Sequence, residues 1–204
     1  MTASPPIQLL EELGRGSTAV VWRATLTENL CGIPKGSEVA CKRYFSGEEA
    51  RACQEREARV GESIQAEGLV RIYAHGEDGE GSWLLMELLT GRNLGEVLAE
   101  ERSLPEPLVR SIGRQLAGAL AGLHEQGISH GDLKPDNARL DQDGRSVLVD
   151  LGFAGEIKSL SEDRRGTPLY LSPEQIDGSA LSPACDVFAL GIVLYELVTG
   201  VHPF

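Results

Sequence analysis

The sequence changes its pattern once, near residue 90, and this change limits the folds that the chain can adopt. Before that point, short segments rich in β-branched and apolar residues alternate with glycine-containing turns, a pattern typical of strands. Segment 48–66 differs, because it is rich in Ala, Glu, Arg and Gln without proline, and it predicts a helix. We expect five strands, at 7–13, 19–25, 37–44, 69–73 and 82–88. Together these elements predict a small antiparallel lobe.

After residue 90 the spacing of apolar residues becomes helical. In segment 105–125 they recur with a period of about 3.6 residues, at Leu108, Ile112, Leu116, Leu120 and Leu123. Pro105 suits the first turn of this helix, and Gly127 suits its C-terminal cap. The fold class predicted is therefore α+β with two lobes, a five-stranded antiparallel lobe at 1–89 and a mainly helical lobe at 90–204. Clefts between lobes are frequent ligand sites.

Composition narrows the partners and the compartment. The net charge of −12 argues against nucleic acid or an anionic membrane as the main partner. No C-x-x-C spacing occurs among the cysteines, so we expect neither a zinc site nor a disulfide framework, and a reducing cytoplasm is favoured. No basic stretch precedes an apolar one near the start, so no signal peptide is predicted. Segment 184–198 is the most apolar, but it contains charged residues and is too short to span a bilayer.

The run 130–137, His-Gly-Asp-Leu-Lys-Pro-Asp-Asn, carries most of the chemistry. It places an acid, Asp132, an ammonium group, Lys134, and an amide, Asn137, at fixed offsets on one short segment. Asp132 can accept a proton from an attacking hydroxyl, Lys134 can neutralise a phosphoryl group, and Asn137 offers an oxygen to a metal ion. These are the needs of phosphoryl transfer, whose catalysis consists mostly of positioning and charge neutralisation.

This run resembles the catalytic loop of eukaryotic-type protein Ser/Thr kinases, a family with bacterial members. One residue departs from the pattern, because Gly131 stands where the family usually has arginine. Segment 147–152 resembles the family's metal-binding segment, with Leu151 where phenylalanine is commoner. By that resemblance Asp150 binds Mg²⁺, a cation that takes carboxylate, phosphate and water oxygens. A strand leading into a turn through Asp and Gly can also be a plain hairpin.

Segment 14–21 lies between the first two expected strands and resembles the glycine-rich nucleotide loop of the kinases. Gly14 and Gly16 allow the backbone to approach phosphates closely. The resemblance implies that Ser17 and Val21 also contact the nucleotide, while Ala19 replaces the third glycine of the pattern. A simple hairpin turn remains the alternative.

Segment 39–42, Val-Ala-Cys-Lys, resembles the strand whose lysine holds the α- and β-phosphates of ATP. The resemblance assigns Ala40 and Lys42 to the nucleotide site. A lysine among apolar strand residues is costly unless it is paired. Glu57 fits the family's usual interval for that partner, with Glu55 and Glu62 as competitors. Two of these three acids must instead be solvated charges on a helix.

Segment 83–88 resembles the last strand of the small lobe and the hinge that follows it. Met86 would lie beside the adenine, and the backbone of Glu87 and Leu88 would contact the adenine edge. A methionine here can equally be a core residue.

Two further departures concern the nucleotide site. Arg139 falls where the family packs an apolar residue under the adenine, and its aliphatic stem can take that place. Gly61 falls where a bulky residue usually braces the helix that carries Glu57. A glycine there is expected to weaken both packing and helix propensity.

Segment 166–174, Gly-Thr-Pro-Leu-Tyr-Leu-Ser-Pro-Glu, resembles the segment that seats peptide substrates in protein Ser/Thr kinases. By resemblance, Thr167 hydrogen-bonds Asp132 and Lys134, which implies serine or threonine acceptors. The preceding loop offers Ser159 and Ser161 as phosphorylation sites. The glycine at 131 cannot pair with a phosphate, so loop phosphorylation is not the expected switch.

Segment 186–204 resembles the central helix of the kinase large lobe, in which Asp186 bonds the catalytic-loop backbone. Kinase large lobes continue for several helices beyond this motif, so we expect a C-terminally incomplete domain, truncated near the end of this helix. Segment 184–198 is apolar on all sides, so we expect other parts of the protein to pack around this helix. Three explanations account for this uncovered helix: the covering helices are missing through truncation, a second chain covers it, or the chain is a minimal domain.

The sequence therefore predicts a protein serine/threonine kinase that transfers the γ-phosphoryl group of ATP, with Mg²⁺, to a hydroxyl on a protein substrate. A small-molecule kinase of the aminoglycoside or choline type shares the His-Gly-Asp opening but lacks segment 166–174. A pseudokinase that binds ATP as a scaffold is the other alternative, favoured by the truncation and by the residues at 61 and 139.

Overall fold

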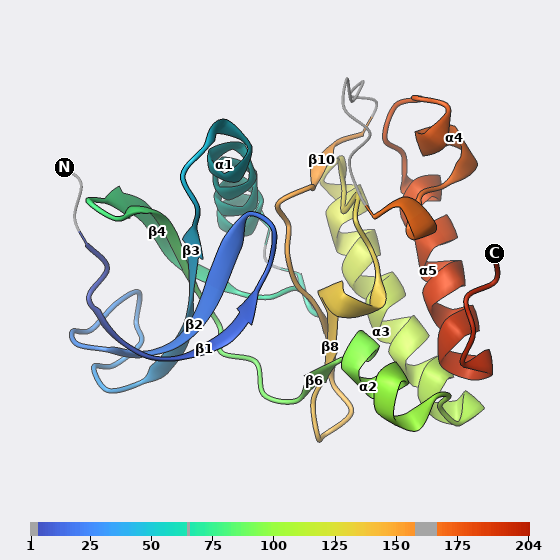
Figure 1. The fold of residues 1–204 in the computed structure, drawn as a ribbon, viewed down its shortest axis with the longest axis horizontal. Coiled ribbons are helices and arrows are strands. Elements are labelled where there is room, and N and C mark those ends of the chain that lie inside the picture. The colour runs from blue at the N-terminus through green and yellow to red at the C-terminus, as the bar shows by residue number, and fades with distance from the viewer. Residues whose placement is uncertain (1–3, 65, 158–166) are drawn as a thin grey trace. The chain divides into compact units, whose positions relative to one another are not determined.

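The computed structural model describes residues 4–64, 66–157 and 167–204. The chain forms two compact units, one drawn from Met1–Ser63 and Val70–Leu89 and the other from Ile64–Leu69 and Thr90–Phe204 (Figure 1). Within the described part of the chain, no helix is long and apolar enough to cross a membrane. Ser159 and Ser161 lie outside the described residues.

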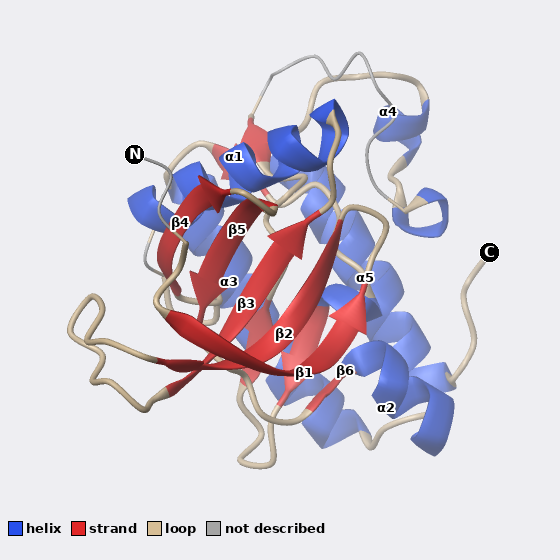
Figure 2. Ribbon diagram, turned by 60° about the vertical axis from the view of Figure 1, so that its left-hand side comes forward, coloured by secondary structure: helices blue, strands red, loops and turns tan. Residues whose placement is uncertain are grey.

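The first unit is built on one antiparallel sheet of five strands in the order β1-β2-β3-β5-β4 (Figure 2). The strands are β1 Ile7–Arg15, β2 Ala19–Leu26, β3 Glu38–Tyr44, β4 Ile72–Asp78 and β5 Gly81–Met86. Buried residues of β2, β3 and β5 form a cluster that comprises Ala24, Leu26, Val39, Cys41, Trp83 and Leu85. The predicted five-stranded antiparallel sheet is therefore confirmed.

The predicted position of the fourth strand is wrong. β4 begins at Ile72 and continues to Asp78, whereas the sequence pattern indicated 69–73. Leu69 makes only an isolated parallel bridge with Leu148, and the Gly68 carbonyl accepts a hydrogen bond from the Leu148 N–H at 2.8 Å. The apolar pattern at 69 thus reflects burial in the second unit. The predicted helix and fifth strand are also shorter than expected, because they end at residues 63 and 86.

Helix α1, Glu48–Ser63, lies against the sheet of the first unit. Acidic residues occupy its first turn, where their negative charge interacts favourably with the positive end of the helix dipole. Its buried positions include Cys53, Glu57, Val60 and Gly61, which recur at helical spacing.

The sequence predicted weak packing at Gly61, but the structure shows a filled space beside this residue. A Cβ at this position would lie 2.1 Å from the Cδ1 atom of Ile72 in β4. The Ile72 side chain therefore fills the volume that a larger residue on α1 would occupy.

The second unit is mainly helical, with two small sheets in the orders β6-β8-β9 and β10-β7. Its helices are α2 Leu94–Glu101, α3 Glu106–Glu125, α4 Pro173–Ile176 and α5 Pro183–Thr199, with 3₁₀ turns η1 Pro135–Asn137 and η2 Pro168–Tyr170. Its strands are β6 Arg92–Asn93, β7 Ile128–Ser129, β8 Ala138–Leu140, β9 Ser146–Leu148 and β10 Gly155–Glu156. Helix α3 matches the predicted 105–125 closely, and Gly127 follows it with a φ of +73°.

Helix α5 packs against α3 and carries the buried Asp186 near its start. Leu194 lies so close to α3 that a Cβ at Gly113 would be 3.1 Å from it. The opposite side of α5 is open, because Val187, Tyr195 and Val198 are large apolar residues that remain exposed. The second unit thus leaves part of this apolar helix without cover among the described residues.

Candidate active site

The centre of the candidate site is the carboxylate of Asp132, which lies between β7 and η1 and is 5% exposed. One oxygen, Oδ1, accepts hydrogen bonds from the Thr167 N–H at 2.7 Å and the Thr167 hydroxyl at 2.9 Å. The other, Oδ2, lies 3.1 Å from Lys134 Nζ and accepts a 3.1 Å bond from Asn137 Nδ2. Lys134 also donates to the Thr167 hydroxyl at 2.7 Å. Three residues named from the sequence, Thr167, Lys134 and Asn137, therefore meet around the carboxylate of Asp132.

Asp186 fixes the backbone that leads into this site. It accepts hydrogen bonds from the His130 N–H at 2.9 Å, the Gly131 N–H at 3.0 Å and the Ser129 hydroxyl at 2.9 Å. His124 Nε2 lies 2.7 Å from it. Burial alone would raise the pKa of Asp186, but the contact with His124, the nearby His130 and the two backbone bonds hold that pKa below its usual value. Asp186 thus bonds the loop backbone as expected.

His124 and Ser129 are partners of Asp186 that the sequence did not indicate. His124 lies in the last turn of α3, where a basic residue also suits the helix dipole. Ser129 is a residue of the short strand β7. Neither position carries a sequence signal that separates it from an ordinary helix end or strand.

Gly131 has a geometric reason to be glycine. Its φ of +77° lies in the left-handed region, which costs energy for residues with a Cβ. A Cβ there would also lie 2.8 Å from the carbonyl oxygen of Phe153. The backbone conformation at this point therefore restricts the residue independently of any phosphate.

The hairpin of β8 and β9 brings Asn137 and Asp150 to the same end. Ala138 pairs with Leu148 in this hairpin, and the Val149 N–H donates to the Asn137 carbonyl at 2.9 Å. The amide nitrogen of Asn137 is bonded to Asp132, so its oxygen is the atom that can bind a cation. Asp150 has a φ of +63°, an unusual value for a residue other than glycine and typical of functional turns.

No group of three or more His, Cys, Asp or Glu side chains among the described residues could hold a metal by itself. One carboxylate and one amide oxygen suit Mg²⁺, because this ion usually keeps water and phosphate oxygens as its remaining ligands.

The first unit carries the second set of predicted residues. Lys42 Nζ donates to Glu57 Oε2 at 2.7 Å, and both side chains are buried. The competing acids are used elsewhere, since Glu55 pairs with Arg51 on the surface of α1 and Glu62 contacts His75. The structure thus selects Glu57 as the partner of Lys42. It also adds Tyr44, whose hydroxyl donates to Glu57 Oε2 at 2.6 Å.

The glycine-rich segment forms the turn between β1 and β2. Gly14 pairs with Val21, and the Gly16 N–H donates to the Ala19 carbonyl at 2.9 Å. A Cβ at Gly14 would meet no atom within 4 Å, and one at Gly16 would meet only the Ala19 oxygen at 3.8 Å. Neither glycine is therefore required by packing within the hairpin, and Ser17 lies in the turn between them and β2.

The predicted adenine contacts lie at the end of β5 and in β8. Ala40 pairs with Met86 across β3 and β5, and Met86 is buried. The Glu87 N–H donates to the Arg71 carbonyl at 2.8 Å, so this N–H is engaged within the first unit. Leu88 follows Glu87 outside any strand. In the second unit the Arg139 guanidinium donates to the Gly91 carbonyl.

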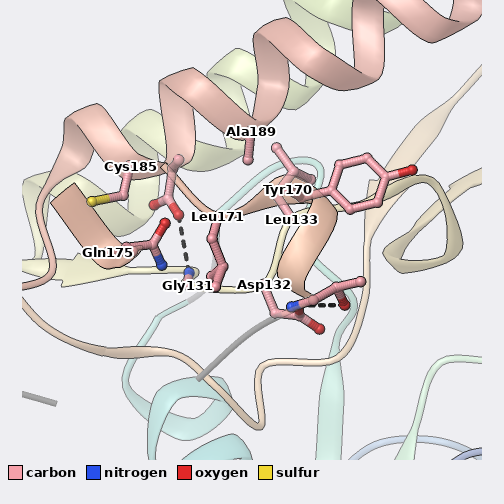
Figure 3. A pocket seen from close by; sticks show the side chains of 10 residues that line it. Gly131, Asp132, Leu133, Tyr170, Leu171, Gln175, Cys185 and Ala189 are labelled. Atoms are coloured by element: carbon pink, nitrogen blue, oxygen red, sulfur yellow. Dashed lines mark hydrogen bonds between the residues drawn. The ribbon is translucent and has the colours of Figure 1, made fainter. Parts of the chain in front are cut away.

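A pocket opens beside Asp132 within the second unit (Figure 3). The loop at 131–133, the segment from Thr167 to Gln175 and the start of α5 line it. Figure 3 shows Leu133, Leu171 and Tyr170 around this space, with the bond from Gly131 to Asp186 at one side. The Tyr170 hydroxyl donates to Glu196 at 2.8 Å, and burial together with this acid raises the pKa of Tyr170.

Comparison with known proteins supports one reading of this geometry. A sequence profile described as the protein kinase domain matches residues 7–204. Serine/threonine-protein kinase PknL of Mycobacterium tuberculosis is 33% identical over 197 residues, which is 95% of this chain and 49% of PknL. Serine/threonine-protein kinase RUNKEL of Arabidopsis thaliana is 33% identical over 96% of this chain and 14% of its own length. Serine/threonine-protein kinase PkaA of Streptomyces coelicolor is 37% identical over 96% of this chain and 39% of its own. The chain thus spans about half the length, or less, of these curated relatives.

Proposed function

This chain belongs to the protein kinase domain family, and on that premise we propose that it transfers the γ-phosphoryl group of ATP to a serine or threonine hydroxyl of a protein. The observation that carries the proposal is the contact set of Asp132, whose carboxylate is held by Thr167, Lys134 and Asn137. A buried acid with a fixed orientation beside an ammonium group is suited to accept a proton while charge is neutralised next to it.

The carboxylate of Asp132 must exchange one partner before it can act as the base. A carboxylate offers about four lone-pair sites, and the bonds from Thr167, Lys134 and Asn137 already use both oxygens. Lys134 is the partner best suited to leave, because its ammonium can turn to a phosphoryl oxygen. The acceptor hydroxyl then takes the vacated site on Asp132 and gives its proton to this carboxylate. Its oxygen forms a bond to the γ-phosphorus of ATP while the bond from that phosphorus to the β,γ-bridging oxygen breaks and ADP leaves.

The contacts of Thr167 are the reason to assign serine or threonine as the acceptor residue. Its hydroxyl accepts from Lys134 while it donates to Asp132, so it links the base to the ammonium group. The relatives are named as serine/threonine-protein kinases, which agrees with this assignment. The protein substrate itself is not specified by these contacts.

Asn137 and Asp150 are the residues that we assign to Mg²⁺. Their donor set fits a hard cation, and the Asn137 amide nitrogen is engaged so that its oxygen is available. When bound, Mg²⁺ supplies positive charge next to the nucleotide phosphates and helps to align them. Asn137 would then serve two purposes, because its nitrogen orients Asp132 and its oxygen would hold the ion.

In the first unit we assign Lys42 to the α- and β-phosphates of ATP, with Glu57 as the group that orients it. Gly14 and Gly16 belong to the same assignment, because the hairpin does not need glycine there for packing. A backbone without Cβ atoms lets phosphates approach closely, and Ser17 and Val21 are assigned to the same nucleotide contact.

Adenine contacts are assigned to Ala40, Met86 and the backbone of Glu87 and Leu88, which follow the last strand of the sheet. Arg139 is assigned to the adenine, which it would contact through its aliphatic stem or through the face of its guanidinium group.

We infer a cytoplasmic setting and no nucleic-acid partner. None of the four cysteines, all of which are described, forms a disulfide, and the net charge is −12. Cysteines without disulfides agree with a reducing compartment supplied with ATP. The negative net charge agrees with repulsion of nucleic-acid phosphates.

The identity of the acceptor tests the proposal. The purified chain is incubated with γ-labelled ATP and Mg²⁺, with a generic protein acceptor in one reaction and with aminoglycosides or choline in another. Label is expected on serine and threonine of the protein and not on tyrosine or the small alcohols. Label only on the small alcohols would move the chain to the small-molecule kinases. Nucleotide binding without any transfer would make it a pseudokinase.

A further inference from the structure

Tyr44 contacts both members of the buried Lys42–Glu57 pair. It follows Lys42 by two residues in β3, so the two side chains lie on the same face of the strand. The Tyr44 hydroxyl donates to Glu57 Oε2 at 2.6 Å, and this oxygen also accepts the 2.7 Å bond from Lys42 Nζ. Lys42 Nζ lies 5.3 Å from the centre of the Tyr44 ring, within the range of a cation–π contact.

The carboxylate of Glu57 depends on these two donors. Glu57 is 0% exposed, and its second oxygen, Oε1, is buried with no hydrogen-bond partner among the described residues. A buried charge is tolerated only when hydrogen bonds and an opposite charge replace water. Removal of one of the two donors on Oε2 would therefore weaken the hold on this carboxylate and on the helix that carries it.

The lysine cannot be the permanent anchor of Glu57 if it also binds phosphates. Phosphate oxygens attract the same ammonium group that Glu57 holds, whereas the Tyr44 hydroxyl has no positive charge that would draw it to them. Tyr44 is fixed to the sheet by its pairing with Ala19 in β2, and its side chain is buried. It can thus keep Glu57 in place while Lys42 is shared with a ligand.

Two further polar contacts join α1 to β4 among the described residues, and both are weaker than the bond from Tyr44. Gln54 Nε2 lies 3.4 Å from His75 Nδ1, and the contact of His75 with Glu62 involves a side chain of Glu62 that is 64% exposed. Exposed contacts of this kind contribute little. The bond from Tyr44 to Glu57 is short, buried and near the middle of α1.

We propose that Tyr44 is a positioning residue of the nucleotide site, whose phenol holds Glu57 and thereby keeps helix α1 seated and Lys42 oriented when nucleotide phosphates bind. This inference rests on the proposed function for the identity of the ligand. It adds a residue that lies outside the motif segments of the sequence, and it acts through Glu57 without contact to the reacting atoms.

Tyr44→Phe tests the proposal, because it removes the hydroxyl and keeps the ring. Affinity for Mg-ATP is measured by calorimetry, and exchange of the α1 backbone amides is measured by hydrogen–deuterium exchange without nucleotide. We expect the affinity to fall about tenfold and α1 to exchange about tenfold faster, while β2 exchanges as in the unaltered chain. Tyr73→Phe is the matched control, since it removes a hydroxyl from β4 of the same sheet and should leave both readouts within about twofold.

A mutant cycle separates positioning from general stability. In a Glu57→Ala background, Tyr44→Phe should change nucleotide affinity by less than about twofold, because its effect passes through the missing carboxylate. Equal effects in both backgrounds, or unchanged affinity and α1 exchange in Tyr44→Phe, would overturn the proposal. If the unaltered chain does not bind Mg-ATP, the proposed function fails. The exchange of α1 then still decides whether Tyr44 holds Glu57.

Discussion

Replacement of Gly61 by alanine should destabilise the protein, although alanine is the better helix former. A Cβ at Gly61 would lie 2.1 Å from Cδ1, 2.7 Å from Cγ1 and 2.8 Å from Cβ of Ile72. The first contact could be relieved by rotation of the isoleucine, but the contact with its Cβ could not. Relief of that contact requires α1 and β4 to move apart.

The size of the effect follows from two opposed contributions. Alanine gains about 1 kcal/mol over glycine in the interior of a helix. Overpacking of a filled core costs about 1–3 kcal/mol, and the contact with a strand Cβ places this site toward the upper end. The expected net loss is about 2 kcal/mol, which corresponds to a fall of about 4–8 °C in melting temperature for a chain of this size.

Thermal and urea unfolding measure this change, with Gly118→Ala as the matched control. Gly118 is an exposed position within α3, where an added Cβ would meet no atom within 4 Å. This control should gain up to about 1 kcal/mol from helix propensity.

Combination with Ile72→Ala tests the packing explanation. Because the alanine at 72 removes the atoms that clash with the new Cβ at 61, the double variant should be more stable than the sum of the two single changes by at least about 1 kcal/mol. Additivity within about 0.5 kcal/mol, or a Gly61→Ala variant that behaves like Gly118→Ala, would refute the reasoning.

Three further changes test other parts of the site. Gly131→Ala should lose about 1–2 kcal/mol in urea unfolding, because φ is +77° and the added Cβ would lie 2.8 Å from the Phe153 oxygen; unchanged stability would contradict this. Asp186→Asn should lose about 3 kcal/mol near neutral pH. Since the pKa of Asp186 is lowered from 3.8, its charge stabilises the fold above that value and the contribution is lost as pH falls through the lowered pKa, so the variant should lack this acid-dependent loss. Thr167→Val should reduce phosphoryl transfer about 10–100-fold through the lost bond to Asp132, and Thr167→Ser should restore it.

The strand and helix periodicities predicted most of the fold, because each follows from local sequence. The fourth strand was misplaced, since Leu69 is apolar for a reason that lies far away in the sequence, its burial beside Leu148 in the second unit. The segment 72–78 has few residues that favour strands, and it pairs with β5 because a hairpin brings it there. The local sequence pattern shows neither the burial of Leu69 in the second unit nor the pairing of segment 72–78 with β5.

The candidate site was largely predictable through the resemblance of its motifs, whereas the contacts that stabilise it were not. The family's usual interval favoured Glu57, but Glu55 and Glu62 stayed competitors, because all three lie on one helix. The buried contact of Glu57 with Lys42 distinguishes it in the structure. The role of Ile72 beside Gly61 and the hydrogen bond of Tyr44 depend on which side chains face each other between a strand and a helix. Such cross-element contacts leave no periodic signal in one sequence.

The central claim is that Asp132 acts as the base in phosphoryl transfer from ATP. Its most direct test compares the unaltered chain with Asp132→Asn at saturating Mg-ATP and a protein acceptor, with nucleotide affinity measured on the same samples. The account predicts a fall in kcat of at least about 100-fold with affinity for Mg-ATP unchanged, because Asn cannot accept the proton but keeps the volume of the side chain. Equal transfer rates in the two proteins, with equal affinity, would contradict it.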